Sequence, residues 1–202
     1  DHGGFTPLLY DFINRDELVE LLAASSGQRF LFNFFRVGGV NFDTNGEFLS
    51  RLGTWRSHVG KTVDMSERVI TDNEVFRSRT IGMGTLSGKD AIALGVSGPN
   101  LRASGVPFDV RKAHPYSIYP ELEFEVVTQS GGDSNARYLQ RIAEIKQSIH
   151  LIDQIVDKMP HGPGQAQVPG IIRPKPGRAY AALEAARGPD RHHALREGGP
   201  KP

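Results

Sequence analysis

Apolar residues recur at helical spacing in three long segments of the chain, residues 7–26, 46–70 and 134–159. Thr6-Pro7 suits the start of the first segment and Gly27 its end, because threonine caps free amides, proline fits a first helical turn and glycine adopts a left-handed conformation. The pattern therefore predicts a mainly α-helical protein.

The third segment has the clearest pattern. Its apolar positions are spaced 3, 4, 3, 4 and 3 residues apart, which places them along one side of a helix that Asp133 or Ser134 caps and that Pro160 follows. A helix of this length spans roughly 40 Å and needs neighbours to cover its apolar side, so we expect a helical bundle. The residues of this stripe are Ile142, Ile145, Ile149, Ile152, Val156 and Met159.

Short β elements are expected between and after the helices. The aromatic run RFLFNFF (29–35) predicts a buried strand or extended segment, and Gly38-Gly39 after it predicts a turn or a close backbone approach. The alternating run ELEFEVV (121–127) predicts a second strand, and residues 178–196 predict a hairpin. The fold class is thus mainly α with short β elements.

The remaining segments contain many glycines and prolines. Short helices are expected over residues 74–95 and an ordered loop over 96–120. We expect a helical core over residues 1–160, a Pro/Gly-rich connector over 161–177 and a hairpin region that begins at 178.

Composition excludes several classes of protein. The formal net charge is +1, which gives no support to nucleic-acid binding, although residues 171–202 hold seven Lys/Arg against three Asp/Glu. The absence of cysteine excludes disulfides, thiolate nucleophiles and cysteine-ligated iron–sulfur clusters within these residues. No stretch approaches the roughly 20 apolar residues of a transmembrane helix.

Catalytic and metal-binding motifs are weak. GMGTLSG (82–88) lacks the preceding strand and the spacing of a dinucleotide loop, so we do not expect this chain to hold NADH. The only histidine pair, His192-His193, would face opposite sides of a strand, which argues against a metal site. Glu121, Glu123 and Glu125 fit a solvated strand face better than a pair of catalytic carboxylates.

Three charged residues share a Gly/Pro-rich loop bounded by apolar side chains: Arg102, Asp109 and Arg111. Charges among apolar residues are usually paired when they are buried. We expect an internal ion-pair network that holds the loop; the alternative is the polar wall of a ligand cavity.

Four segments, taken in order, resemble the 49 kDa subunit (also called the D subunit) of complex I-type NADH:quinone oxidoreductases, a relative of [NiFe]-hydrogenase large subunits. LRASG followed by DVRK and PY is specific, as are GDxxxRY followed by RxxExxxS and the opening DxGxxTP. The resemblance covers about residues 1–188. Its segments are RVGGVNFD (36–43), NEVFRSRTIGMG (73–84), GVSGPNLRASGVPFDVRKAHPY (95–116) and GGDSNARYLQRIAEIKQSIHLIDQIVDKMPHGP (131–163).

The resemblance implies a hydrogenase-large-subunit-like helical bundle in the peripheral arm of the complex. Its expected partners are the iron–sulfur subunit with the terminal cluster, other peripheral-arm subunits, the membrane arm and quinone. NADH, FMN and the iron–sulfur clusters would be bound by other subunits, and this chain would hold no cofactor or metal. The implied location is peripheral, on the cytoplasmic face of a bacterial or archaeal plasma membrane.

The resemblance also assigns residues to the quinone pocket. Asp1 matches the aspartate that hydrogen-bonds a quinone-ligating histidine, which itself lies outside these residues, and Phe5 and Thr6 fall in the same motif. We expect the 202 residues to be inactive and marginally stable by themselves. The alternatives are a membrane-bound [NiFe]-hydrogenase large subunit, a deazaflavin-dependent quinone reductase of the same fold, or a noncatalytic scaffold.

Overall fold

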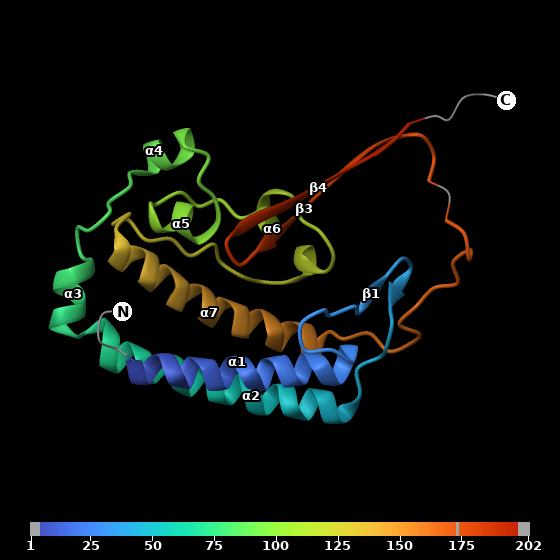
Figure 1. The fold of residues 1–202 in the computed structure, drawn as a ribbon, viewed down its shortest axis with the longest axis horizontal. Helices are drawn as coiled ribbons and strands as arrows, with labels where there is room; N and C mark the ends of the chain where they lie inside the picture. The colour runs from blue at the N-terminus through green and yellow to red at the C-terminus, as the bar shows by residue number, and fades with distance from the viewer. Residues whose placement is uncertain (1–4, 173, 198–202) are drawn as a thin grey trace. The chain divides into compact units, whose positions relative to one another are not determined.

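The computed structural model describes residues 5–172 and 174–197, which form two compact units. The first unit runs through Phe76 and takes up the chain again over Ile155–Ile172, and the second comprises Arg77–Gln154 and the hairpin region that follows residue 173. The mainly α class with short β elements is confirmed (Figure 1). None of the helices within these described residues is long and apolar enough to cross a bilayer.

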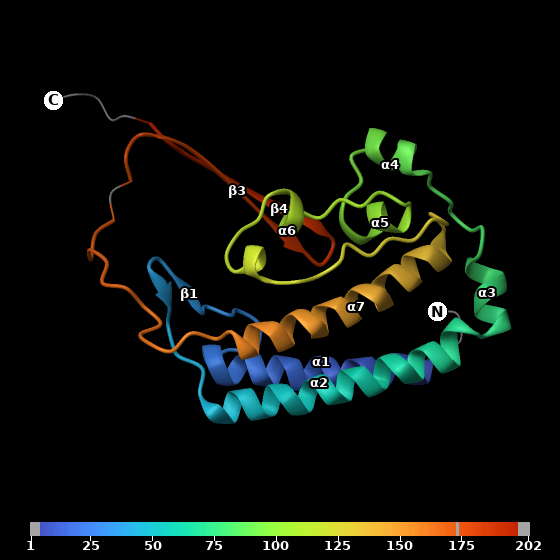
Figure 2. The same cartoon turned by 180° about the vertical axis from the view of Figure 1, so that it is seen from behind.

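The first unit is built on two long helices, α1 (Phe5–Ser26) and α2 (Gly46–Ser66), which confirm the first two helical predictions. They lie side by side and run antiparallel, as Figures 1 and 2 show. Gly27 ends α1 with a φ of 79° and donates its N–H to the Ala23 carbonyl, as the sequence predicted. Asn45 caps α2 through its side-chain oxygen.

Polar side chains fix the register of the two helices. Asn14 donates to the Thr62 hydroxyl at 2.7 Å, and the Trp55 indole N–H donates to the Asn14 carbonyl at 2.9 Å. His58 contacts the Glu17 carboxylate at 2.9 Å. A five-residue π-helical segment, η1 (Glu67–Thr71), continues α2.

The Gly38-Gly39 pair makes a turn, as predicted. Val37 and Gly38 join the two-residue strands β1 (Phe35–Arg36) and β2 (Gly39–Val40), and φ is positive at both glycines. A methyl group on Gly39 would clash with the backbone of Gly164, because the connector after α7 pairs with this hairpin. Only glycine therefore fits there.

The prediction of a buried strand or extended segment over residues 29–35 is wrong. Phe30 is 74% exposed and Phe35 is 80% exposed. The amides of Asn33 and Phe34 bond to carbonyls two residues earlier, which folds the segment into tight turns. The glycine turn then limits strand pairing to two residues, so no sheet is available to bury the aromatic rings.

The second unit contains most of the buried apolar side chains. Its helices are α3 (Glu74–Thr80, shared with the first unit), α4 (Gly88–Ala93), α5 (Gly98–Ala103), α6 (Val110–Ala113), the 3₁₀ turn η2 (Tyr119–Glu121) and α7 (Ser134–Asp157). The short helices α3 and α4 confirm the prediction over 74–95. The predicted loop over 96–120 is wrong in part, because α5 and α6 form inside it.

Helix α7 confirms the predicted extent, but the predicted apolar stripe is not the buried face of the helix. Ile145 is 38% exposed, whereas Leu151, which lies off the stripe, is 4% exposed. Ala136 and Gln140 are the other buried residues of the helix. The extended segment 122–127 and α5 pack on the Gln140 side, which displaces the buried face away from the predicted stripe.

The hairpin predicted over 178–196 is confirmed as β3 (Gly177–Ala185) and β4 (Gly188–Arg196), an antiparallel two-stranded sheet. Gly188 at its turn packs against Ser97 and Gly98, where an added methyl group would lie 2.5 Å from the Ser97 hydroxyl. This glycine therefore anchors the turn end of the hairpin to the start of α5.

Candidate functional site

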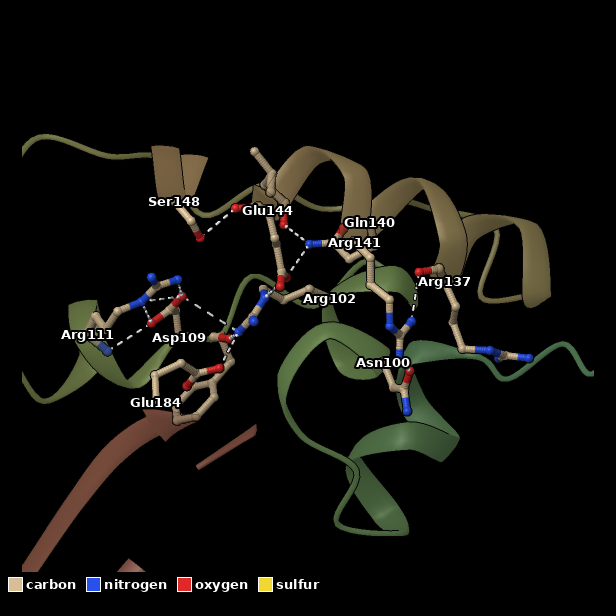
Figure 3. Close-up of polar contacts among 12 residues, drawn as sticks. Asn100, Arg102, Asp109, Arg111, Arg137, Gln140, Arg141, Glu144, Ser148 and Glu184 are labelled. Atoms are coloured by element: carbon tan, nitrogen blue, oxygen red, sulfur yellow. Dashed lines mark hydrogen bonds and ion pairs between the residues drawn. The ribbon is translucent and has the colours of Figure 1, made fainter. Parts of the chain in front are cut away.

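A buried cluster of charges occupies the centre of the second unit, and Arg102 is its hub (Figure 3). The residue is 2% exposed. Its Nε donates to Glu144 at 2.6 Å, and its Nη1 donates to Glu184 at 3.0 Å and to the Phe108 carbonyl at 2.9 Å. One guanidinium thus ties α5 to α7, to the hairpin and to the loop before α6.

Asp109 and Arg111 form the second part of this cluster. The Asp109 carboxylate accepts three hydrogen bonds from the Arg111 guanidinium, the shortest at 2.6 Å, and lies 3.7 Å from Arg102. It also accepts from the Arg111 backbone N–H at 2.8 Å and so caps α6. Arg111 in turn lies over the Phe124 ring, 4.9 Å from its centre.

The environment holds these groups in their charged forms. Burial alone raises the pKa of Asp109, but the hydrogen bonds and charge of Arg111, with the charge of Arg102, outweigh it and hold this pKa below its ordinary value. For Arg102, burial lowers the pKa, and the bonds to Glu144 and Glu184 more than reverse this effect. Both shifts favour the charged forms of Arg102 and Asp109.

The cluster includes two carboxylates that sequence reasoning missed. Glu144 belongs to α7, four residues from both Gln140 and Ser148, and accepts from the Gln140 amide at 2.7 Å. Glu184 lies on β3, and its second oxygen accepts from the Val110 N–H at 3.2 Å. The sequence offered a signal for Glu144 in the RxxExxxS spacing, but Glu184 is 82 residues from Arg102 and offered none.

Gln140 is fully buried, and only part of the hydrogen-bonding capacity of its side chain is satisfied. Its amide nitrogen donates to Glu144 and to the Val127 carbonyl, both at 2.7 Å, whereas its side-chain oxygen has no partner among the described residues. The three predicted residues Arg102, Asp109 and Arg111 thus share one interior cluster with Gln140, Glu144 and Glu184. Apart from the Gln140 oxygen, the hydrogen bonds of this cluster link α5, α6, α7 and β3, and such a buried network makes an interior rigid.

A neighbouring set of bonds clamps the glycine-rich loop after α3. Asp133 accepts from the Gly82 N–H and the Ala136 N–H, each at 2.7 Å, and so caps α7. Burial raises the pKa of Asp133, but these backbone bonds and Arg137 outweigh burial and lower it. Arg137 also donates to the Gly84 carbonyl at 3.0 Å. The GMG sequence is therefore a structural turn, as its poor match to a dinucleotide loop predicted.

The residues expected at a quinone pocket belong to the start of the first unit. Phe5 and Thr6 form the first turn of α1, and both are exposed, Phe5 by 68%. Asp1 lies outside the described residues. Leu8 and Leu9 on the next turn are 45% and 48% exposed. This end of α1 presents an aromatic and aliphatic surface.

The other polar residues singled out in the sequence are on the surface. Glu121, Glu123 and Glu125 are exposed, as expected of a solvated face, and His192 and His193 are exposed on β4. Among residues 5–172 and 174–197 no group of three or more His, Asp or Glu side chains is placed to hold a metal ion. The absence of a cofactor stays a prediction.

Comparison with known proteins places these features in one family. The family described as "Respiratory-chain NADH dehydrogenase, 49 Kd subunit" matches residues 1–188. The chain is 39% identical over 202 residues to the D subunit of the NADH-quinone oxidoreductase of Clostridium beijerinckii, and covers 55% of that protein. It is 41% identical over 207 residues to the corresponding D subunit of Chlorobium luteolum, with 98% of this chain and 52% of the relative covered. The chain thus spans about half the length of the curated relatives it matches.

Proposed function

The chain belongs to the 49 kDa subunit family of respiratory-chain NADH dehydrogenases, and from this membership we propose that it is the part of that subunit that helps to form the quinone-reducing site of an NADH-quinone oxidoreductase. The observation that carries the proposal is the match along residues 1–188, which includes the opening DxGxxTP motif. Relatives named as D subunits of NADH-quinone oxidoreductases match along the whole chain.

Reduction of a quinone to a quinol takes two electrons and two protons. In this proposal the electrons come from an iron–sulfur cluster on a neighbouring subunit, since these 202 residues contain no cysteine to ligate one. The protons come from side chains that face the quinone oxygens, and the enzyme couples the reaction to proton translocation. NADH and FMN are bound by other subunits of the complex, and this chain lies in the peripheral arm, on the cytoplasmic face of the membrane.

The start of α1 suits contact with a quinone ring. Phe5 offers an exposed aromatic face, Thr6 a hydroxyl, and Leu8 and Leu9 aliphatic surface beside them. Pockets for small organic ligands are typically apolar with a few polar groups that fix orientation. In this proposal Phe5 packs on the ring, Thr6 contributes a polar contact and Asp1 orients the histidine that bonds the quinone oxygen.

The test is photolabelling of the assembled enzyme, which contains the full-length subunit, with an azido-quinone during turnover with NADH. We expect label on the peptide that contains residues 1–12, and we expect substrate quinone in excess to remove it. The proposal fails if this peptide stays unlabelled while another part of the enzyme carries label that competes with quinone. Label that excess quinone does not remove also counts against a specific site.

A further inference from the structure

Asn14 interrupts the apolar stripe by which α1 packs against α2. Pro7 and Leu21 lie seven residues before and after Asn14, on the same face of the helix, and both are buried. Asn14 itself is half-buried. A polar side chain thus occupies a position of the helix pair where an apolar residue would contribute more to stability.

Two residues of α2 bond Asn14. The Thr62 hydroxyl accepts from the Asn14 side-chain amide at 2.7 Å, and the Trp55 indole N–H donates to the Asn14 backbone carbonyl at 2.9 Å. A slip of α1 along α2 by one turn is about 5.4 Å, which is longer than a hydrogen bond. Such a slip would separate the amide from the hydroxyl and leave both groups unpaired between the helices, so the bond specifies one register.

The contact between Glu17 and His58 constrains the register less. It lies one turn further along the pair at 2.9 Å, but the two side chains are 39% and 45% exposed. An exposed ionic contact contributes little, because water and salt screen it. The hydrogen bond between Asn14 and Thr62 is therefore the stronger constraint on the register.

The register of α1 determines where its first turn lies. Phe5 and Thr6, which the proposed function places against the quinone, belong to the same continuous helix as Asn14. They precede it by nine and eight residues, roughly 12–14 Å along the axis. A shift of the helix at Asn14 consequently moves Phe5 and Thr6 by the same distance.

We infer that Asn14 and Thr62 are positioning residues for the quinone site: their hydrogen bond fixes the register of α1 on α2 and thereby the place of Phe5 and Thr6. The inference rests on the proposed function, which puts the quinone at this end of α1. The bond lies in the contact between the two helices, so it does not depend on what covers their outer faces. A misplacement of about 1 Å can slow an enzyme by roughly a hundredfold, and a slipped helix would move these residues further.

The test variant replaces both partners, Asn14→Leu with Thr62→Val, in the full-length subunit of the assembled enzyme. Because neither polar group is left unpaired, we expect thermal stability that is unchanged or higher. We also expect kcat/KM for quinone to fall by roughly tenfold or more, with normal NADH oxidation by an artificial acceptor. A cryo-electron microscopy structure of the variant should show α1 shifted along α2 or present in more than one register.

Two single variants serve as controls. Thr62→Ser keeps the hydroxyl that Asn14 bonds and should retain the register and the quinone kinetics of the wild type. Thr54→Val is the matched loss of a hydroxyl from α2. Thr54 and Thr62 each donate to the carbonyl four residues earlier, but it is Thr62 that accepts from Asn14. We therefore expect Thr54→Val to behave as the wild type does.

The inference is overturned if the double variant has normal quinone kinetics, in whichever register, or slow quinone kinetics in the wild-type register. It is also overturned if Thr54→Val slows quinone reduction equally, or if the double variant does not assemble, since the pair would then act on folding. Photolabelling of the wild-type enzyme separates this failure from failure of the proposed function. Label on residues 1–12 together with normal kinetics of the double variant removes the positioning role alone, whereas a wild type without that label removes both.

Discussion

Gln154 and Glu123 hold each other by two hydrogen bonds across 31 residues of sequence. The Gln154 side-chain oxygen accepts the Glu123 backbone N–H at 2.8 Å, and its amide nitrogen donates to the Glu123 carbonyl at 2.6 Å. One side chain of α7 thus satisfies both backbone groups of a residue in an extended segment, as a neighbouring strand would do. Gln147 bonds Glu125 and Gln140 bonds Val127 in the same direction along the helix.

These glutamines explain why the strand predicted over 121–127 is wrong although its alternation is right. Leu122 and Phe124 are buried and Glu121, Glu123 and Glu125 are exposed, as a half-buried strand requires. The alternation of apolar and polar residues indicates which side chains face the core, but it does not indicate which groups form hydrogen bonds with the backbone. Here the partner is a helix with a glutamine at every seventh position, which the sequence alone did not reveal.

The pair predicts a measurable contribution to stability. Gln154→Ala should lower the free energy of unfolding of the full-length subunit by about 1–2 kcal/mol, because it removes two hydrogen bonds that solvent only partly replaces. Gln147→Ala is the matched control, since Gln147 makes one longer bond, at 3.4 Å. Denaturant unfolding would contradict the role of Gln154 if the two variants lost equal stability.

The charge cluster predicts a larger effect. Arg102→Gln should cost about 3–5 kcal/mol, because it leaves the carboxylates of Glu144 and Glu184 without their buried partner. Arg102→Lys should restore little of this, since an ammonium cannot reproduce the separate Nε and Nη1 bonds. Arg141→Gln, an exposed change on the same helix as Glu144, is the control for loss of a positive charge. Unfolding curves for Arg102→Gln that match those of the control would rule out the hub role.

Asp109 predicts a dependence of stability on pH. Its pKa in the folded chain is lowered, so near the ordinary value of about 3.9 the unfolded chain binds more protons. The stability it contributes is present above that value and is lost as the pH falls through the folded pKa. Asp109→Asn should therefore reduce stability at neutral pH and flatten its decline in acid, as measured by denaturant unfolding between about pH 3 and 7.

The pKa of Asp11 is shifted in the opposite direction from that of Asp109. Burial raises the pKa of Asp11, so the folded chain binds more protons than the unfolded chain, and its contribution falls as the pH rises through the folded pKa. Asp11→Asn should steepen the acid limb of the stability curve slightly, whereas Asp109→Asn flattens it. A flattening by both variants would show that loss of any carboxylate, rather than its environment, governs the slope.

The sequence prediction and the structure differ in which face of α7 is buried, and this difference can be tested. Leu151→Ala should destabilise the protein by about 2–5 kcal/mol because it opens a cavity, whereas Ile145→Ala, on the predicted stripe, should cost much less in the isolated subunit. Thermal unfolding of the two variants compares them directly. Equal losses would mean that the stripe is buried after all.

The sequence predicted three of the six residues in the charge cluster, because Arg102, Asp109 and Arg111 share one loop and are close in the chain. It did not predict Glu184, since the placement of β3 depends on Gly188 packing against Gly98, a contact between segments about 90 residues apart. The long helices were predictable because their apolar period persists over many turns. The aromatic run 29–35 was not, because it folds into tight turns at Asn33 and Phe34 and only two residues at its end pair as a strand.

The last prediction concerns Asp1, whose proposed role is to orient and charge the quinone-bonding histidine. A carboxylate beside an imidazole fixes which ring nitrogen carries a proton and favours the imidazolium, which is the better proton donor as the quinone takes up electrons.

Asp1→Asn keeps the shape and much of the capping ability but removes the charge. We expect normal assembly, normal NADH oxidation with an artificial acceptor, and quinone reduction slowed by roughly tenfold or more, which is about 1.4 kcal/mol in the barrier. Phe30→Ala, which removes an exposed aromatic residue elsewhere in the first unit, is the control for nonspecific effects of surface changes. Wild-type quinone turnover in Asp1→Asn would show that the charge of this carboxylate has no part in quinone reduction, whereas a loss of both activities would show that the substitution disturbs assembly rather than proton transfer.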